Sequence, residues 1–194
     1  MTECFVGCGL GSEATDTVRL HGGRRVWQAG VMRQWQVASG LLADDRGLLL
    51  VANRRRDGRV DWSTPGGVID AGETPLVALG REVREETGLE VSRWSSLCWT
   101  VDVGFVDLEM QLHVEVHLAS EFTGGLRFED PDGIVRDGRF FEPDEVGPQL
   151  TESPAWVAEP LIEWINAPWS GERRFRFAAH GTNPGQLRAV RLDC

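Results

Sequence analysis

The chain has 194 residues, of which 41% are hydrophobic and 26% are charged, a composition typical of a folded domain with a substantial core. The formal net charge is −10, so the chain lacks the basic surplus that binds a nucleic-acid polymer. Its basic residues are all arginine, which excludes a lysine Schiff base and a P-loop lysine.

Residues 1–33 are rich in glycine and weakly patterned, and we expect them to form an N-terminal extension. The first residues, MTECFVGCGLG, lack the basic start and long apolar run of a signal peptide. No apolar run in the sequence is long enough to span a bilayer. We therefore expect a cytoplasmic protein without a membrane partner. The cysteines lack zinc-site spacing and indicate free thiols: Cys4, Cys8, Cys98 and Cys194.

Two strands are predicted next, over Gln34–Ala43 and Leu48–Asn53. The aspartates and glycine between them suit a tight turn. A polar loop, Arg54–Ser63, is predicted to follow the second strand.

A helix with clear start and stop signals comes after this loop. Thr74 suits the N-cap, Pro75 the first helical position and Gly88 the C-terminal stop. The predicted apolar face of this helix consists of Leu76, Leu79 and Val83.

Three glutamates lie beside that apolar face, at positions i, i+3 and i+4: Glu82, Glu85 and Glu86. Like charges this close repel one another unless a cation lies among them. A hard divalent cation is the natural candidate, because Mg²⁺ and Mn²⁺ prefer carboxylate oxygens.

The remaining elements are predicted from shorter patterns. Leu108–Leu118 alternates between apolar and polar residues, as in a strand with one buried face, and Arg139–Glu142 resembles a short strand. A helical region with a break at Pro160 is predicted next. We expect 167–194 to be a C-terminal extension, in which the alternating Arg174–Phe177 forms an edge strand or a dimer contact.

The segment Gly67–Leu89 carries the most specific motif in the chain, and we call it the box. Its defined positions are Gly67, Glu73, Arg81-Glu82-Val83, Glu85-Glu86 and Gly88-Leu89, separated by five, seven, one and one residues. This pattern resembles the Nudix box at every defined position. A solvated acidic helix face is the alternative, but it leaves the spacing of Gly67, Glu73 and Arg81 unexplained.

The resemblance implies a fold and an activity. The fold would be an α/β/α sandwich around a mixed β-sheet, over residues 34–166. The activity would be hydrolysis of a phosphoanhydride bond in a nucleoside diphosphate derivative, by water that a divalent metal activates. Dimers are frequent in the family, and the expected partner is a small nucleotide.

The resemblance also assigns roles within the box. The carboxylates of Glu82, Glu85 and Glu86 and the carbonyl of Gly67 would bind Mg²⁺ or Mn²⁺. An ion pair between Arg81 and Glu73 would orient these ligands, as groups behind a metal site commonly do.

The resemblance further implies a base or extra ligand outside the box, from a later loop, and the acidic segment after the predicted strand Leu108–Leu118 lies in the corresponding region. Glu129 is the first candidate and Asp132 the second, with Asp137 also near. The Asp-Pro and Asp-Gly pairs of this segment are also typical of an ordinary turn.

Substrate contacts are predicted from two residue types. Arg54 follows the second strand and suits bidentate binding of a phosphate, although a solvated basic turn explains it equally well. Trp62 is the main candidate for stacking on a base, together with Trp35 and Trp156.

The substrate itself is less defined than the reaction. The absence of the signatures of several family subgroups favours a MutT-like hydrolase of nucleoside triphosphates or modified nucleotides. An ADP-sugar or dinucleotide pyrophosphatase stays open, as does a ligand-sensing module that has lost catalysis. An isopentenyl diphosphate isomerase is disfavoured because 34–66 contains no cysteine.

Overall fold

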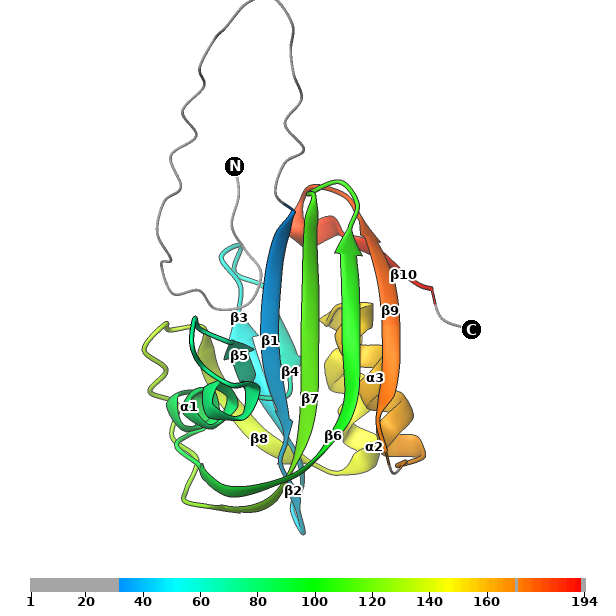
Figure 1. Ribbon diagram of the computed structural model, residues 1–194. Helices are drawn as coiled ribbons and strands as arrows, with labels where there is room; N and C mark the ends of the chain where they lie inside the picture. The colour runs from blue at the N-terminus through cyan, green and yellow to red at the C-terminus, as the bar shows by residue number, and fades with distance from the viewer. Residues whose placement is uncertain (1–31, 170, 193–194) are drawn as a thin grey trace, which may run out of the picture.

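The computed structural model describes residues 32–169 and 171–192 of the chain. All but the last two residues of the predicted N-terminal extension, 1–33, lie outside these ranges, and so do Cys4, Cys8 and Cys194. The described residues form two β-sheets flanked by helices (Figure 1).

The larger sheet has six strands. In spatial order they are β10 (Arg188–Arg191), β9 (Arg173–His180), β6 (Glu90–Phe105), β7 (Met110–Thr123), β1 (Arg33–Leu41) and β5 (Gly66–Val68). The β1–β7 and β6–β9 pairs are parallel, and the other three pairs are antiparallel. The sheet is therefore mixed, as predicted.

The smaller sheet is built around one central strand. It comprises β2 (Ala43–Asp44), β3 (Gly47–Arg54), β4 (Val60–Ser63) and β8 (Val135–Phe141), with every other strand pairing with β3. The helices are α1 (Pro75–Thr87), α2 (Pro143–Gln149) and α3 (Ala155–Asn166). Single 3₁₀ turns cover Leu150–Glu152 and Pro184–Gln186. Over the described ranges, no helix is both long and apolar enough to cross a membrane.

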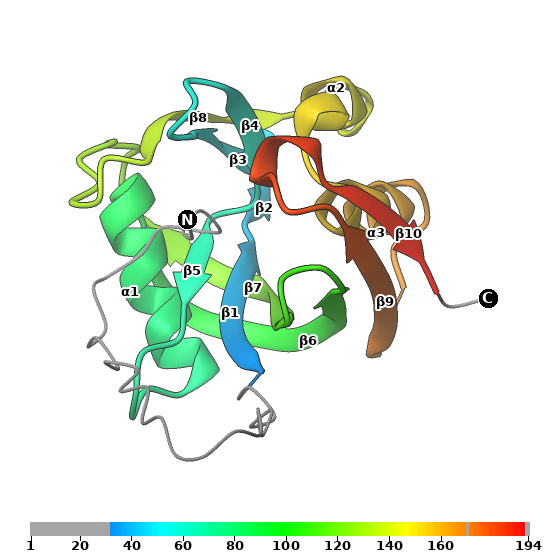
Figure 2. The same ribbon diagram turned by 90° about the horizontal axis from the view of Figure 1, so that it is seen from above.

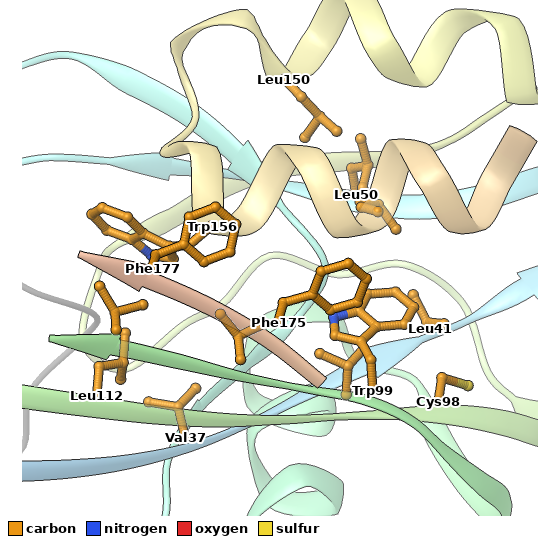
Figure 3. Packing of buried hydrophobic residues seen from close by; sticks show 14 of the residues in the cluster. Val37, Leu41, Leu50, Cys98, Trp99, Leu112, Leu150, Trp156, Phe175 and Phe177 are labelled. Atoms are coloured by element: carbon orange, nitrogen blue, oxygen red, sulfur yellow. The ribbon is translucent and has the colours of Figure 1, made fainter. Parts of the chain in front are cut away.

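The helices lie on opposite sides of the sheets. In Figures 1 and 2, α1 lies on one side, whereas α2 and α3 lie on the other. Alternation along β1 divides the apolar residues in the same way: Val37 packs in a core with Leu161 of α3, and Ala38 packs in a second core with Leu79 of α1. The predicted α/β/α arrangement is confirmed. Figure 3 shows the first of these cores.

Several elements differ from the sequence predictions. The long strand β6 and the helix α2 were not predicted, and β4 occupies the end of the predicted loop Arg54–Ser63. α3 runs through Pro160 without the predicted break. A proline removes one backbone donor from a helix, and the side chain of Pro160 is buried, which favours keeping it within α3.

The C-terminal segment is part of the main sheet. Arg174–Phe177 is a strand, as predicted, and belongs to β9, which pairs with β6. The register pairs β10 with the later part of β9 only, from Phe177 to His180. An edge strand or a dimer contact over the earlier residues stays a prediction. Phe175 and Phe177 are 2% and 1% exposed, so the alternate residues of this segment are buried aromatics that fix its face toward the core.

Candidate active site

The box helix α1 begins and ends where the sequence predicts. Thr74 caps its N-terminus and accepts a hydrogen bond from the Val77 amide at 3.4 Å, and Pro75 opens the helix. Gly88 ends it with a φ of 73°, a left-handed conformation that favours glycine. These caps fix the register of the acidic residues. Leu76 is 41% exposed, so its prediction as a core residue is wrong, and Ala78 takes that place.

The chain before α1 passes close to two of the box glutamates. The Gly66 amide donates a hydrogen bond to Glu86 Oε2 at 2.9 Å. A Cβ atom on Gly67 would lie only 2.4 Å from the carboxyl carbon of Glu82. Glycine is therefore required at position 67 by the close approach of the Glu82 carboxylate, not by its backbone conformation.

Arg81 ties the acidic groups of the box together. Its guanidinium donates to Glu73 through Nε at 3.1 Å and Nη2 at 2.9 Å, forming the ion pair that the box predicts. Nη1 donates to Glu82 at 2.7 Å and to Glu85 at 3.4 Å. Among the described residues, no three acidic, histidine or cysteine side chains stand together in an arrangement that would hold a metal ion. Arg81 is therefore a counter-charge for Glu73, Glu82 and Glu85, as its ion pairs show.

Two of the box carboxylates are strongly desolvated. Burial raises the pKa of Glu86 well above its ordinary value, against the lowering effect of the Gly66 amide. Burial also raises the pKa of Glu82, against the opposing hydrogen bond from Arg81. Glu85 is different, because its side chain is 35% exposed and lies outside the cavity described next. Glu82 and Glu86 are therefore the carboxylates that gain most from a bound cation.

Both of these carboxylates line a cleft of about 980 Å³, counting the space at its mouth that is open to solvent. Part of the cleft is lined by apolar side chains from β1, β6, β7 and α3, and we call this the apolar part. Its residues are Val37, Trp99, Val101, Leu112, Val114, Val116, Trp156, Val157 and Leu161. Figure 3 shows Val37, Trp99, Leu112 and Trp156 within the first core.

Polar groups that pair with residues of the segment 61–66 line a further part of the cleft, and we call these pairs the polar row. They are Arg55–Asp61, Asn53–Ser63, Ser39–Thr64 and Gly66–Glu86. At one end of the row lies an ion pair, at the other a box carboxylate, and between them are neutral hydrogen-bonding side chains. A ligand with a polar part and an apolar or aromatic part matches this lining, and an anionic group would need a cation beside the carboxylates.

The acidic loop before β8 contributes two aspartates to the cleft. Asp130 and Asp132 line it, whereas Glu129, the first-choice base, is exposed and does not. Asp130 accepts hydrogen bonds from the backbone amides of Ile134 at 2.7 Å and Val135 at 2.8 Å, so it organises the turn. Within the described residues, the backbone amides of this turn donate to the Asp130 carboxylate and not to that of Asp132.

The predicted phosphate ligand also lies outside the cleft. Arg54 is exposed at the end of β3, whereas the next residue, Arg55, lines the cleft. Arg55 forms a bidentate ion pair with Asp61, at 2.6 Å and 2.7 Å. Asn53 also faces the cleft, so the two-residue period of β3 was the signal that pointed to Arg55.

Of the three predicted tryptophans, the structure brings one into the cleft. Trp156 lines the cleft and packs edge-on against Phe105 at 5.5 Å. Trp62 packs edge-on against Phe141 at 5.2 Å and, like Trp35, lies at the border of the first core and outside the cleft. Trp99, which the sequence reasoning did not select, also lines the cleft.

A family model described as NUDIX domain matches residues 33–165, so the chain belongs to the Nudix family. The chain is 35% identical to the ADP-ribose pyrophosphatase of Mycobacterium tuberculosis over 109 residues, which are 53% of this chain and 51% of that protein. It is 32% identical to the 8-oxo-dGTP diphosphatase of Proteus vulgaris over 82 residues, 41% of this chain and 72% of that protein. The chain spans about half the length, or less, of the first curated relatives that it matches.

Within the family, the chain is MutT-like. The MutT Nudix hydrolase of Burkholderia pseudomallei superposes with a TM-score of 0.57 and 26% identity, over 68% of this chain and 97% of that one. The MutT protein of Bacillus halodurans gives a TM-score of 0.58 at 22% identity, over 80% and 97%, and shows the fold alone. The family predicted from the box is confirmed.

Proposed function

We propose that the protein is a divalent-metal-dependent hydrolase of phosphoanhydride bonds in small nucleotides. The observation that carries this proposal is the pair of desolvated carboxylates, Glu82 and Glu86, that face the cleft beside Gly67. Carboxylates in such surroundings need a positive charge to stay ionised. A polyphosphate also needs cations before it can enter a cleft lined by acidic residues.

The donor set fits a hard cation. Carboxylate oxygens of Glu82 and Glu86 and the carbonyl of Gly67, which all line the cleft, would hold Mg²⁺ or Mn²⁺, both of which prefer oxygen ligands. Glu85 would join them as a ligand only once its side chain leaves Arg81, because the described residues do not hold the three carboxylates together. When bound, the metal would neutralise charge on the pyrophosphate oxygens and lower the pKa of a bound water.

The chain's own residues would do the remaining work. Arg81 positions Glu82 and Glu85 through its hydrogen bonds and is itself held by Glu73. Asp132 is the better candidate for accepting the proton of the attacking water, because it lines the cleft and Glu129 does not. The apolar part would bind the nucleobase and the polar row the sugar and phosphates, which keeps the scissile bond at the carboxylates.

Nucleoside triphosphates, including oxidised ones, are the first substrate class that we propose. The similarity to proteins named 8-oxo-dGTP diphosphatases supports this choice. An ADP-sugar is the second, supported by the 35% identity to an ADP-ribose pyrophosphatase. The intact box disfavours a sensing module without catalysis. We further propose that the protein is cytoplasmic and that it forms a homodimer.

A phosphate-release screen tests this function. The protein would be incubated with Mg²⁺, Mn²⁺ or EDTA and with nucleoside triphosphates, 8-oxo-dGTP and ADP-ribose. Inorganic pyrophosphatase would convert pyrophosphate released from the triphosphates, and phosphatase, added with ADP-ribose only, would convert the monophosphate products, to inorganic phosphate. We expect metal-dependent release with at least one substrate, and a loss of several orders of magnitude in Glu86→Gln at unchanged circular dichroism. Nucleotide binding without turnover in the wild type would instead support the sensing module.

A further inference from the structure

The middle of the cleft is lined by neutral polar groups. The register of the large sheet places Ser39 between Gly66 on β5 and Val116 on β7, and Val116 lies beside Trp99 on β6. Gly66 holds the buried Glu86, whereas Val116 and Trp99 belong to the apolar part. The pair Ser39–Thr64 therefore lies between the carboxylates and the apolar part, and the second neutral pair, Asn53–Ser63, lines the same cleft.

Asn53 is the most buried member of these neutral pairs. It is 7% exposed, lines the cleft, and donates a hydrogen bond from its amide nitrogen to Ser63 Oγ at 2.9 Å. Ser39 and Thr64, by contrast, satisfy each other through a 2.6 Å hydrogen bond. The Asn53 amide is therefore held in one orientation by a single hydrogen bond, on its nitrogen.

The oxygen of the same amide is available to a ligand. Over the described residues, no buried side-chain nitrogen or oxygen lacks a hydrogen-bond partner. The described part of the chain provides no partner for Asn53 Oδ1, so this oxygen must reach the open space of the cleft. A carboxamide this deep is normally hydrogen-bonded at both ends. An acceptor oriented in this way suits an O–H or N–H group of a bound molecule.

The chemistry of the cleft identifies that donor. In a nucleoside diphosphate derivative, the sugar lies between the anionic phosphates and the flat base, and its hydroxyls are hydrogen-bond donors. Arg55 is excluded from this role because it has no acceptor atom and is engaged in a bidentate pair with Asp61.

We propose that Asn53, oriented by Ser63, is a specificity-determining residue that accepts a hydrogen bond from a sugar hydroxyl of the substrate. The assignment rests on the proposed function and deepens it. Asn53 selects nucleotides that carry this hydroxyl over analogues that lack it, because the analogue leaves the desolvated amide oxygen without a donor. Ser63 is a positioning residue in this assignment, since its Oγ accepts the hydrogen bond that orients the Asn53 amide.

The experiment compares substrates as well as variants. The nucleoside triphosphate that the wild type hydrolyses fastest is measured beside its 2′-deoxy and 3′-deoxy forms. We expect removal of one of these hydroxyls to lower the wild-type kcat/KM about tenfold, as for one hydrogen bond. In Asn53→Ala, the kcat/KM of the parent nucleotide should fall by a similar factor, and the discrimination should disappear.

A matched control and a second variant keep the outcome interpretable. Thr100 is as buried as Asn53, at 7% exposed, but it lies outside the cleft, so Thr100→Val should keep the wild-type discrimination. If Asn53→Ala does not fold, Ser63→Ala removes only the orienting group and should reduce the discrimination. Equal discrimination in the wild type and in a folded Asn53 or Ser63 variant would overturn the assignment. So would a wild type that hydrolyses all three nucleotides equally. A wild type inactive on every nucleotide would instead contradict the proposed function.

Discussion

Replacing Gly67 by alanine tests whether the position of the Glu82 carboxylate controls turnover. A Cβ atom at position 67 would lie 2.4 Å from the carboxyl carbon of Glu82 and 2.5 Å from Oε1, whereas ordinary contacts begin at 3.4 Å. The carboxylate must therefore retreat by about 1 Å, because it is the flexible end of its side chain.

A displacement of this size has a large effect on rate and a small one on stability. A misplacement of about 1 Å in catalytic geometry costs on the order of 10²-fold, which corresponds to about 2.7 kcal/mol in activation free energy. We expect kcat/KM of Gly67→Ala to fall by about this factor. The free energy of unfolding should change by less than about 1 kcal/mol, because the side chain of Glu82 yields and the backbone does not.

The assay is steady-state phosphate release with the best substrate from the screen, together with urea unfolding of each variant. Gly80→Ala is the matched control: Gly80 lies in α1, and a Cβ atom there would meet nothing within 4 Å. That variant should gain about 0.5–1 kcal/mol in the free energy of unfolding and keep its rate. A folded Gly67→Ala variant with the wild-type kcat/KM would refute the reasoning.

Three further predictions use other parts of the molecule. Asp132→Ala should lower kcat by about 10²-fold or more, whereas Glu129→Ala should leave the rate unchanged; equal rates would contradict the choice of base. Leu79→Ala should cost about 3 kcal/mol in the free energy of unfolding and the exposed Leu76→Ala under about 0.5, and similar losses would be inconsistent with the two environments. Burial alone would raise the pKa of Asp102, but hydrogen bonds from a histidine and an arginine outweigh it, and the net pKa is lowered. Asp102→Asn should therefore cost up to about 1 kcal/mol at pH 7 and progressively less below about pH 4, by denaturant unfolding across pH. A pH-independent loss would argue against this origin.

The sequence was most informative where structure depends on local chemistry. The start and end of α1 follow from Thr74, Pro75 and Gly88, because capping involves only neighbouring residues. The pair Arg81–Glu73 follows from the spacing of the box. The proximity of Gly67 to Glu82 was also implied, although only the fold gives the close approach that makes glycine necessary.

The sequence predictions of strands and site residues fail where contacts between distant parts of the chain determine the structure. The strand β6 begins with a bulged, mostly exposed half, which hides the later alternation of Trp99, Val101 and Val103. Arg54 is the predicted phosphate ligand, but Arg55 is the arginine that lines the cleft. Asn53 lines it too, so side chains at every second position from β3 onward face the cleft. No pattern in the acidic loop reveals which carboxylate its turn leaves exposed to the cleft.

The sheet and the first core of this protein extend beyond the residues that match the family model. The family match ends at residue 165, yet β9 continues the main sheet beyond it and contributes Phe175 and Phe177 to the first core. A chain shortened to residues 33–165 would leave one edge of β6 without its partner strand. It would also remove Phe175 from its contact with Trp99 and Phe177 from the first core. We expect such a fragment to aggregate. We infer that the stability of the family-matched domain depends on the C-terminal segment that completes its sheet.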